Sequence, residues 1–282
     1  MTTLDQYLRA GIETFTSAAV GSPRLTAETL LMFALNCDRA HLFAHPEHIL
    51  STDESSRWDA ALAQRIRGVP TQYITGHQEF WGLDLIVSPA VLIPRPETEH
   101  IVEIVLKLAR SFSSPRIVDV GTGSGCIALA LAKELPYAEI HAVDISPATL
   151  EIARANAARH GLSECIRFQE SDLLDVFSPS AADFDFVVSN PPYVSDLDKA
   201  SLQSEVRDFE PHTALFAGPT GLDVIERLIP QAQHALKHEG WLLMEIGKGQ
   251  GSTTLELLRN WSRVAIEPDL QGIPRVVTAQ QP

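Results

Sequence analysis

The segment Ser189-Asn190-Pro191-Pro192-Tyr193 places an amide, two prolines and an aromatic ring directly after a predicted strand. Each proline removes a backbone N–H and fixes its own φ angle, so the turn offers carbonyl groups and the Asn190 amide oxygen to another molecule. A planar –NH2 group needs such acceptors, one for each of its hydrogens, and Tyr193 can pack on a flat partner. We predict that Asn190, Pro191 and Tyr193 are catalytic, and that Pro192 helps them to bind a planar nitrogen.

A glycine-rich motif, Asp119-Val120-Gly121-Thr122-Gly123-Ser124-Gly125, follows an earlier predicted strand and precedes a helix. Glycines allow a tight turn and a close approach of the backbone to a ligand. The spacing differs from the G-x-G-x-x-G dinucleotide fingerprint, and no lysine follows as in a P-loop. Asp144 ends the next strand, where a carboxylate can accept both hydroxyls of a ribose, while Ser146 is expected to cap the following helix. These features suit either NAD or S-adenosylmethionine.

Further residues are candidates for the same pocket. Asp172 follows the third strand and could accept a hydrogen bond from an adenine amino group, with Leu173 packing on the ring; a solvated loop acid is the alternative. Phe80 could form a wall of the substrate pocket or belong to the core of a hairpin. Arg95 could hold an acidic or carbonyl group, but we favour a structural salt bridge for it.

The elements that must position these residues alternate between strands and helices. The sequence predicts strands at 116–120, 139–144, 166–170, 184–189, 241–246, 263–268 and 275–279. It predicts helices at 97–110, 126–135, 147–160 and 221–236. Such alternation indicates an α/β fold with a mostly parallel sheet covered on both faces. Ligands of such sheets lie beyond the carboxyl ends of the strands, where all the motifs fall.

The preceding part of the chain has a different pattern. Residues 1–76 show apolar residues at three- and four-residue steps, which predicts a small helical domain. Residues 77–94 are rich in apolar and β-branched residues broken by glycine and proline, which indicates a β-hairpin linker. Residues 95–282 then form the second domain.

Composition narrows the class of protein. The net charge is −14, which disfavours a long nucleic-acid substrate, because proteins that bind one neutralise phosphates with a basic surface. The 3 cysteines are widely spaced and indicate neither a disulfide framework nor a zinc site, and we expect no metal. No apolar run is long enough to cross a membrane, and the N-terminus has no targeting pattern. We expect a cytoplasmic monomer without membrane or nucleic-acid binding.

Taken together, the motifs resemble those of the release factor glutamine methyltransferases, the HemK/PrmC family of class I S-adenosylmethionine-dependent methyltransferases. The resemblance extends to Ile93-Pro94-Arg95-Pro96-Glu97-Thr98-Glu99, Phe209-Glu210-Pro211 and Glu245-Ile246-Gly247 with Gln250. It implies a helical domain that helps to seat the substrate and a Rossmann-like domain with a seven-stranded sheet. The implied cofactor is S-adenosyl-L-methionine, with contacts expected from Gly121, Thr122, Gly123, Ser124, Gly125, Asp144, Asp172, Leu173 and Asn190.

The reaction implied by this resemblance is N5-methylation of the glutamine in the Gly-Gly-Gln loop of class-1 peptide chain release factors, the expected protein partners. An amide nitrogen needs no prior deprotonation, because its proton becomes acidic once the methyl group arrives, so we predict no dedicated general base. A ribosomal protein glutamine is equally compatible with the motif, which recognises the amide and not the protein. An adenine amino group is the other alternative, but it predicts a basic groove. An NAD oxidoreductase or a non-enzymatic cofactor-binding protein fits the motifs less well.

Overall fold

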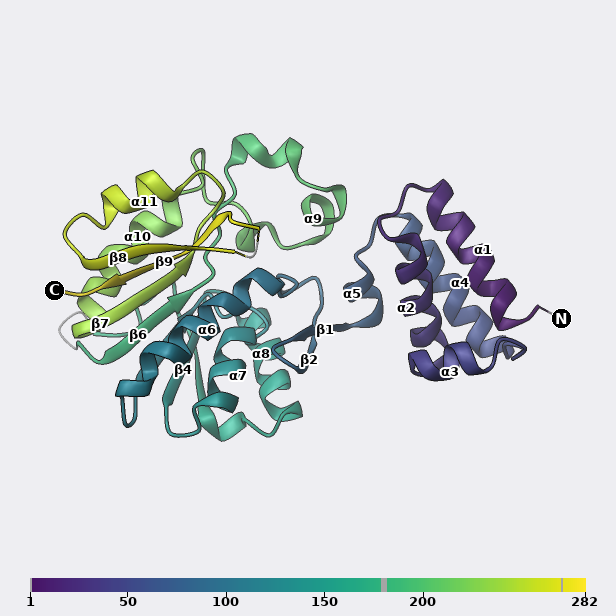
Figure 1. Ribbon diagram of the computed structural model, residues 1–282, viewed down its shortest axis with the longest axis horizontal. Helices are drawn as coiled ribbons and strands as arrows, with labels where there is room; N and C mark the ends of the chain where they lie inside the picture. The colour runs from purple at the N-terminus through teal and green to yellow at the C-terminus, as the bar shows by residue number, and fades with distance from the viewer. Residues whose placement is uncertain (1, 179–181, 270) are drawn as a thin grey trace. The chain divides into compact units, whose positions relative to one another are not determined.

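The computed structural model describes residues 2–178, 182–269 and 271–282. The chain forms two compact units (Figure 1). One comprises the residues through His77 together with Gln203–Phe209, and the other comprises Gln78–Leu202 and Glu210–Pro282. The first is helical and the second contains the sheet, as the change of sequence pattern near residue 77 predicts.

The helical unit is built from short amphipathic helices with well-defined ends. Its helices are α1 (Leu4–Ser17), α2 (Pro23–Leu35), α3 (Arg39–Ala44), α4 (Thr52–Ile66) and α5 (Thr71–Thr75). Thr3 and Ser51 form capping boxes at the starts of α1 and α4, each satisfying a backbone N–H that the helix leaves free. The apolar faces meet in a core that includes Phe15, Leu30 and Trp58.

One helix of this unit comes from far along the chain. Helix α9 (Ser204–Phe209) contributes Glu205, whose carboxylate lies 2.8 Å from the guanidinium of Arg65, a side chain that is only 8% exposed. The Phe209 ring comes so close to Gly68 that a Cβ there would lie 3.3 Å from Cε2. The division of the sequence at residue 76 does not foresee this contribution.

In the part of the chain that the structure describes, seven strands form the sheet of the second unit, in the order β5-β4-β3-β6-β7-β9-β8. Strand β9 runs antiparallel to both of its neighbours, and the other pairs are parallel. The strands are β3 (Arg116–Val120), β4 (Glu139–Asp144), β5 (Ile166–Glu170), β6 (Phe184–Ser189), β7 (Leu236–Glu245), β8 (Ser262–Pro268) and β9 (Pro274–Gln280). The predicted α/β class is confirmed, and β3 to β6 have the predicted bounds.

Helices cover both faces of this sheet. They are α6 (Glu99–Leu108), α7 (Cys126–Glu134), α8 (Pro147–Arg159), α10 (Asp223–Ala235) and α11 (Gly251–Leu257). Strand residues alternate between two cores: Ile117 packs with the residues of α6 and α7, whereas Val118 packs with those of α10. This alternation holds the sheet between two layers and leaves the loops at the strand ends free to build a site.

A tight hairpin precedes the sheet domain. Strands β1 (His77–Phe80) and β2 (Leu83–Ile86) are joined by Trp81 and Gly82, whose φ angles of 54° and 66° are both positive, as in a type I′ turn. Asn156 of α8 fastens the hairpin: its Oδ1 accepts from the Ile86 N–H at 2.7 Å, and its Nδ2 donates to the Ile86 carbonyl at 3.0 Å.

Burial corrects the prediction for Phe80. Its side chain is 1% exposed and belongs to the core cluster beneath α6 and α7. The ring therefore packs against the body of the domain, and it is not among the residues that line the pocket described below. Of the two interpretations of this hairpin aromatic, the core interpretation holds.

Candidate active site

A cavity of about 360 Å³ lies beyond the carboxyl ends of β3, β4 and β6. Most of the predicted site residues line it: Gly121, Thr122, Gly123, Ser124, Asp144, Asp172, Leu173, Asn190 and Pro192. Gly125, Pro191 and Tyr193 are not among the lining residues, although each adjoins one. The separate motifs of the sequence are thus brought to one place.

The glycine-rich loop closes over the end of β3. The N–H groups of Gly121 and Thr122 both donate to the carbonyl of Val143, at 2.9 and 3.0 Å, so the loop is fastened to β4. Gly121 has a φ of +70°, and a Cβ there would meet nothing within 4 Å, which leaves the backbone open to a ligand. Gly125 serves packing instead, since a Cβ there would lie 2.5 Å from Leu129 Cδ1.

Asp119 is a buried carboxyl at the end of β3, directly beneath this loop. Its Oδ2 accepts from the Thr122 hydroxyl at 2.7 Å and from the Ala128 N–H at 3.2 Å. Its Oδ1 is buried without a hydrogen-bond partner among the described residues. Burial, opposed by those two hydrogen bonds and aided by the nearby Asp144 carboxylate, raises the pKa of Asp119 to about 7. Its position between the apolar residues Val118 and Val120 is the signal that the sequence offers for this residue.

Of the roles predicted for Asp144 and Ser146, the structure confirms the one for Ser146. The Ser146 side chain accepts from the Thr149 N–H and caps α8, which confirms its role. Asp144 lines the cavity, where its two oxygens accept from the N–H groups of Gly123 at 3.1 Å and Ser146 at 3.0 Å. Burial raises the pKa of Asp144 above its ordinary value. Its role as a ribose ligand stays a prediction.

Asp172 has a partner that the sequence did not reveal. Its Oδ2 lies 2.6 Å from Nη2 of Arg227, a residue of α10 that also lines the cavity. The side chains are 41% and 50% exposed, so this is a solvated ion pair of modest strength. Leu173 beside it has a φ of 53°, an unusual conformation for leucine. A pair 55 positions apart leaves no local signal in one sequence.

Asn190 is held from behind by a chain of buried hydrogen bonds. Its Nδ2 donates to Thr98 Oγ1 at 3.0 Å, and the Thr98 hydroxyl donates to Glu245 Oε2 at 2.8 Å. The other oxygen of Glu245 accepts from the Tyr193 hydroxyl at 2.9 Å. Tyr193 packs against the core cluster that contains Met244. Its predicted stacking on a flat partner has no support in this arrangement and stays a prediction.

The backbone of the same turn is fixed by Gln250. Its Nε2 donates to the carbonyls of Tyr193 and Gly221, at 3.0 and 3.1 Å, and its Oε1 accepts from the Gly247 N–H at 2.8 Å. Gly221 has a φ of +73°, and a Cβ there would lie 2.3 Å from the Tyr193 carbonyl oxygen. Gly247 and Gln250, which the sequence motif contains, therefore support the shape of the Asn-Pro-Pro-Tyr turn together with Gly221.

Arg95 forms the structural salt bridge that the sequence favoured. Its Nη2 lies 2.5 Å from Oε1 of Glu210, whose side chain is 1% exposed. The second oxygen of Glu210 accepts from the Ile93 N–H at 3.2 Å. Arg95 also lines the cavity, so the pair fixes the segment that forms one of its walls.

The mostly parallel sheet, the glycine loop after β3 and the Asn-Pro-Pro-Tyr turn after β6 define a class I methyltransferase. Solved structures agree on the fold: the hMettl16 catalytic domain in complex with MAT2A 3'UTR hairpin 1 has a TM-score of 0.58 at 18% identity, covering 95% of this chain and 90% of that one. The T. thermophilus 16S rRNA N2 G1207 methyltransferase (RsmC), in complex with AdoMet and guanosine, has a TM-score of 0.54 at 17% identity, covering 73% and 50%.

Sequence comparison narrows this class to one family. Residues 6–76 match the PrmC N-terminal domain and residues 100–206 the methyltransferase small domain. The release factor glutamine methyltransferase of Koribacter versatilis is 53% identical over 280 residues, 99% of each chain, and that of Xylella fastidiosa strain 9a5c is 42% identical, covering 96% of this chain and 98% of that one. The chain belongs to the release factor glutamine methyltransferase family.

Among the described residues, no group of three or more His, Cys, Asp and Glu side chains could hold a metal ion. Within the same residues, no helix is both long and apolar enough to cross a membrane.

Proposed function

We propose that this chain transfers a methyl group from S-adenosyl-L-methionine to the side-chain nitrogen of the glutamine in the Gly-Gly-Gln segment of class-1 release factors. One observation carries the proposal. Asn190 and Pro192 line the same cavity as the glycine loop and Asp144, so acceptors suited to a planar –NH2 group stand beside a loop suited to a nucleoside cofactor.

The residues of the cavity fit this cofactor. The backbone at Gly121 is open to a close neighbour, Asp144 suits a ribose, and Asp172 with Leu173 suits an adenine. When bound, S-adenosylmethionine supplies a methyl group on a positively charged sulfur.

The residues of the Asn-Pro-Pro-Tyr turn position the substrate nitrogen and do not act as an acid or a base. Methyl transfer is an in-line displacement, and the amide lone pair is delocalised, so the nitrogen reacts only when it is aimed well. The Asn190 amide oxygen and the Pro191 carbonyl would accept the two amide hydrogens and direct the nitrogen at the methyl group. Positioning of this kind is worth ~7–11 kcal/mol of the barrier. The amide proton is lost after transfer, so no general base is required.

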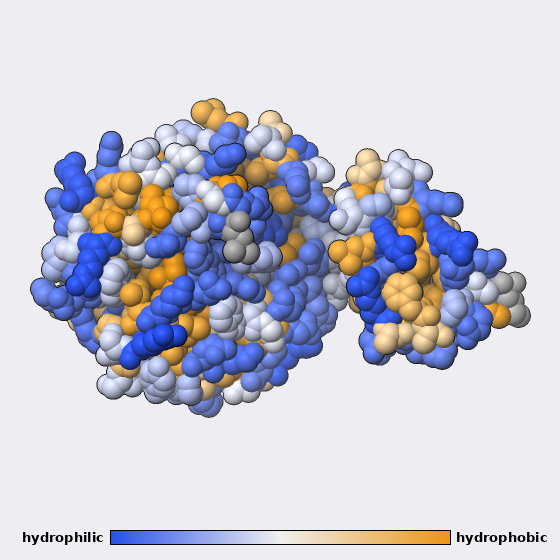
Figure 2. Space-filling model, viewed as in Figure 1, coloured by the Kyte–Doolittle hydropathy of each residue, from blue (hydrophilic) through white to orange (hydrophobic). Residues whose placement is uncertain are grey.

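A protein substrate suits the surface of the helical unit. Leu25, Phe33, Phe43 and Ile49 are 40–56% exposed there, and Figure 2 shows apolar surface among hydrophilic residues on this unit. Such exposed apolar residues favour a protein partner, and a net charge of −14 disfavours nucleic acid. We propose that this unit helps to seat the release factor. The enzyme would act as a monomer in the cytoplasm, where translation ends.

The test is transfer of labelled methyl groups. The purified protein and labelled S-adenosylmethionine would be incubated with a Gly-Gly-Gln release factor, with the same factor in which the glutamine is changed to alanine, with ribosomal proteins, and with duplex DNA. Label in the Gly-Gly-Gln factor alone is the expected result. Label in DNA or only in ribosomal protein would overturn the substrate, and no label anywhere would overturn the activity.

A further inference from the structure

The two ends of the Asn190 amide are not equivalent for the reaction. Only the oxygen can accept a hydrogen from the glutamine –NH2 group, whereas the Asn190 –NH2 end would repel it. A free asparagine side chain can turn either end forward by rotation about its last bond. The proposed function, on which this inference rests, therefore requires something that keeps the oxygen toward the cavity.

The hydrogen bonds behind Asn190 have a fixed direction. In its ionised form the Glu245 carboxylate has only acceptors, and it receives the Tyr193 hydroxyl at 2.9 Å and the Thr98 hydroxyl at 2.8 Å. Thr98 thereby donates its one hydrogen to Glu245, so its oxygen can only accept from Asn190. The contact of 3.0 Å between Thr98 Oγ1 and Asn190 must then be made by the amide nitrogen.

Burial keeps water away from the hydrogen bonds that Thr98 and Glu245 make. The Thr98 and Glu245 residues are each 1% exposed, so few other partners can reach their polar atoms. They come from separate elements: Thr98 ends the short 3-10 helix Pro96–Thr98, Glu245 ends β7, and Asn190 follows β6. An unsatisfied donor or acceptor at such a depth costs about 1–3 kcal/mol, which disfavours the flipped amide.

We propose that Thr98 and Glu245 are positioning residues that hold the Asn190 amide with its oxygen toward the substrate nitrogen. Neither is a catalytic residue, because they act through Asn190. Together with Tyr193 they form a relay of hydrogen bonds from the core to the turn. Tyr193 thus serves the reaction by fixing Glu245.

Thr98→Val keeps the shape of the side chain and removes only the hydroxyl. It is expected to lower kcat for a Gly-Gly-Gln factor roughly 10- to 100-fold, with the Kd for S-adenosylmethionine nearly unchanged. Thr98→Ser retains the hydroxyl and should restore most of the rate. Thr278→Val is the matched control, because Thr278 is a buried threonine of β9 in the same unit that does not line the cavity; it should leave kcat unchanged.

A double substitution separates positioning from general support of the fold. In an Asn190→Ala background, Thr98→Val should cause no further loss, because the group through which Thr98 acts is gone. An equal loss in both backgrounds, a wild-type rate for Thr98→Val, or a Thr98→Ser rate as low as that of Thr98→Val would each overturn the proposal. If Thr98→Val does not fold, Glu245→Gln takes its place, since its –NH2 can donate to Thr98 and reverse the relay; an unchanged rate there would also overturn it.

A measurement that does not depend on enzyme activity can test this inference separately from the proposed function. NMR of the protein labelled with ¹⁵N in asparagine side chains would report the Asn190 –NH2 group. We expect slow hydrogen exchange of one Asn190 amide hydrogen in the wild type and in Thr98→Ser, and fast exchange in Thr98→Val. If the wild type methylates no release factor but shows this pattern, the proposed function fails and the relay stands. Fast exchange in the wild type would overturn the relay whatever the activity.

Discussion

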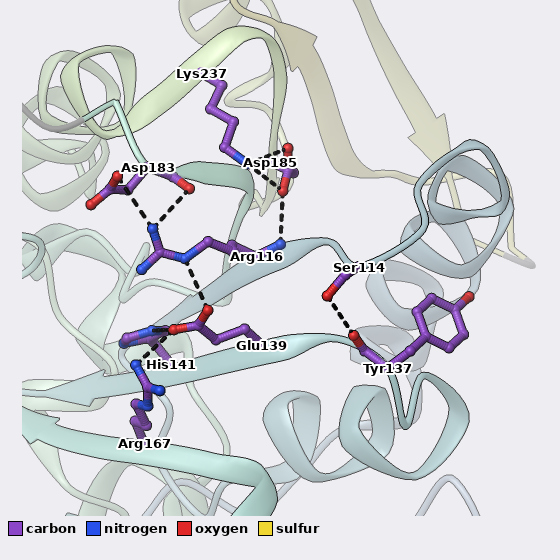
Figure 3. Close-up of polar contacts among 9 residues, drawn as sticks. All are labelled: Ser114, Arg116, Tyr137, Glu139, His141, Arg167, Asp183, Asp185 and Lys237. Atoms are coloured by element: carbon purple, nitrogen blue, oxygen red, sulfur yellow. Dashed lines mark hydrogen bonds and ion pairs between the residues drawn. The ribbon is translucent and has the colours of Figure 1, made fainter.

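The central sheet has one edge formed by the amino ends of its parallel strands and another formed by their carboxyl ends. Charged residues lie at both edges, but their partners differ. At the amino ends of β3, β4 and β6, the charges neutralise one another (Figure 3). Arg116 lies 3.3 Å from Glu139 and 3.2 Å from Asp183, and Lys237 binds both oxygens of Asp185 at 2.9 Å. The hydrogen bond from His141, followed by the charges of Arg116 and Arg167, holds the pKa of Glu139 below its ordinary value.

At the carboxyl ends of β3, β4 and β7, three carboxyl groups receive neutral donors instead. Asp119, Asp144 and Glu245 accept from hydroxyls and backbone N–H groups, and within the described ranges none of the three lies in an ion pair. Burial raises the pKa of each above its ordinary value. Clustered charge therefore does not mark the functional edge of this sheet. The better mark is a carboxyl group held away from water without a cation, a common feature of functional sites.

The largest expected effect concerns the functional edge. Asn190→Ala removes an acceptor for the substrate amide and should lower the transfer rate by about 10²–10³-fold, in the range seen when a positioned polar group is removed. The Kd for S-adenosylmethionine should stay nearly the same, because the glycine loop and Asp144 are untouched. Single-turnover transfer and calorimetric titration measure the two quantities. A parallel fall in both would show that Asn190 serves mainly the cofactor.

The pH dependence of stability should have opposite signs at the two edges. The pKa of Asp119 rises from 3.8 to about 7 on folding, so the folded state binds more protons between these values and stability falls as pH rises through them. Asp119→Asn removes this loss, and its free energy of unfolding relative to wild type should grow by on the order of 2–4 kcal/mol from pH 4 to pH 7.

Glu139→Gln is the matched variant at the other edge. The folded pKa of Glu139 lies below its ordinary value of 4.5, so its stabilisation is present above that value and is lost as pH falls through the folded pKa. The cost of Glu139→Gln should therefore shrink toward low pH. Urea unfolding of wild type and both variants at several pH values measures the two slopes. Slopes of the same sign would contradict the contrast between the edges.

A smaller effect is expected from the glycine behind the catalytic turn. Gly221→Ala places a Cβ 2.3 Å from the Tyr193 carbonyl oxygen, so the turn must shift. Gly161 has a similar φ of +70° but open space around its missing Cβ, which makes Gly161→Ala the control. We expect about 1 kcal/mol of destabilisation for the control and about 1–3 kcal/mol more for Gly221→Ala, with a loss of kcat only in the latter. Equal effects in thermal unfolding and in rate would show that the turn adapts.

The smallest effect is expected at the amino edge. Lys237→Ala removes a half-exposed ion pair, while Asp185 still accepts from the Arg116 N–H at 2.7 Å. The free energy of unfolding should fall by less than about 1 kcal/mol, and methyl transfer should not change. A measurable loss of kcat in this variant would mean that the two edges are coupled.

Local sequence predicted much of the fold. Strands β3 to β6 are apolar runs bounded by clear turns, and their bounds match the structure. The start of β7 was missed, because Lys237-His238-Glu239 is polar and the pairing of β7 with β6 shifts in register there. The bulge hides five residues of strand from any pattern with a period of two.

The site shows the same limit. The glycine loop, Asp144 and Asn190 could be predicted because each lies at the end of a strand or within a few residues after it. The pairing of the residues that fix the site was not predicted: Thr98 and Glu245 are 147 positions apart, and Arg95 and Glu210 are 115 apart. Contacts of this kind depend on which strands become neighbours, and a single sequence does not contain that information. Phe80 was ambiguous for the same reason, since its burial depends on α6 and α7.

Helix α9 has a consequence for how the chain matures. The carboxylate that neutralises buried Arg65 belongs to Glu205, and ribosomes make that residue only after most of the sheet domain. A nascent or excised fragment ending at His77 would contain helices α1 to α5. Of the hydrogen-bond and ion-pair partners that Arg65 has among the described residues, that fragment would keep only the carbonyl of Val69. The helical unit is therefore compact in space but discontinuous in sequence. Its last segment, Gln203–Phe209, is an insertion within the sequence of the sheet domain.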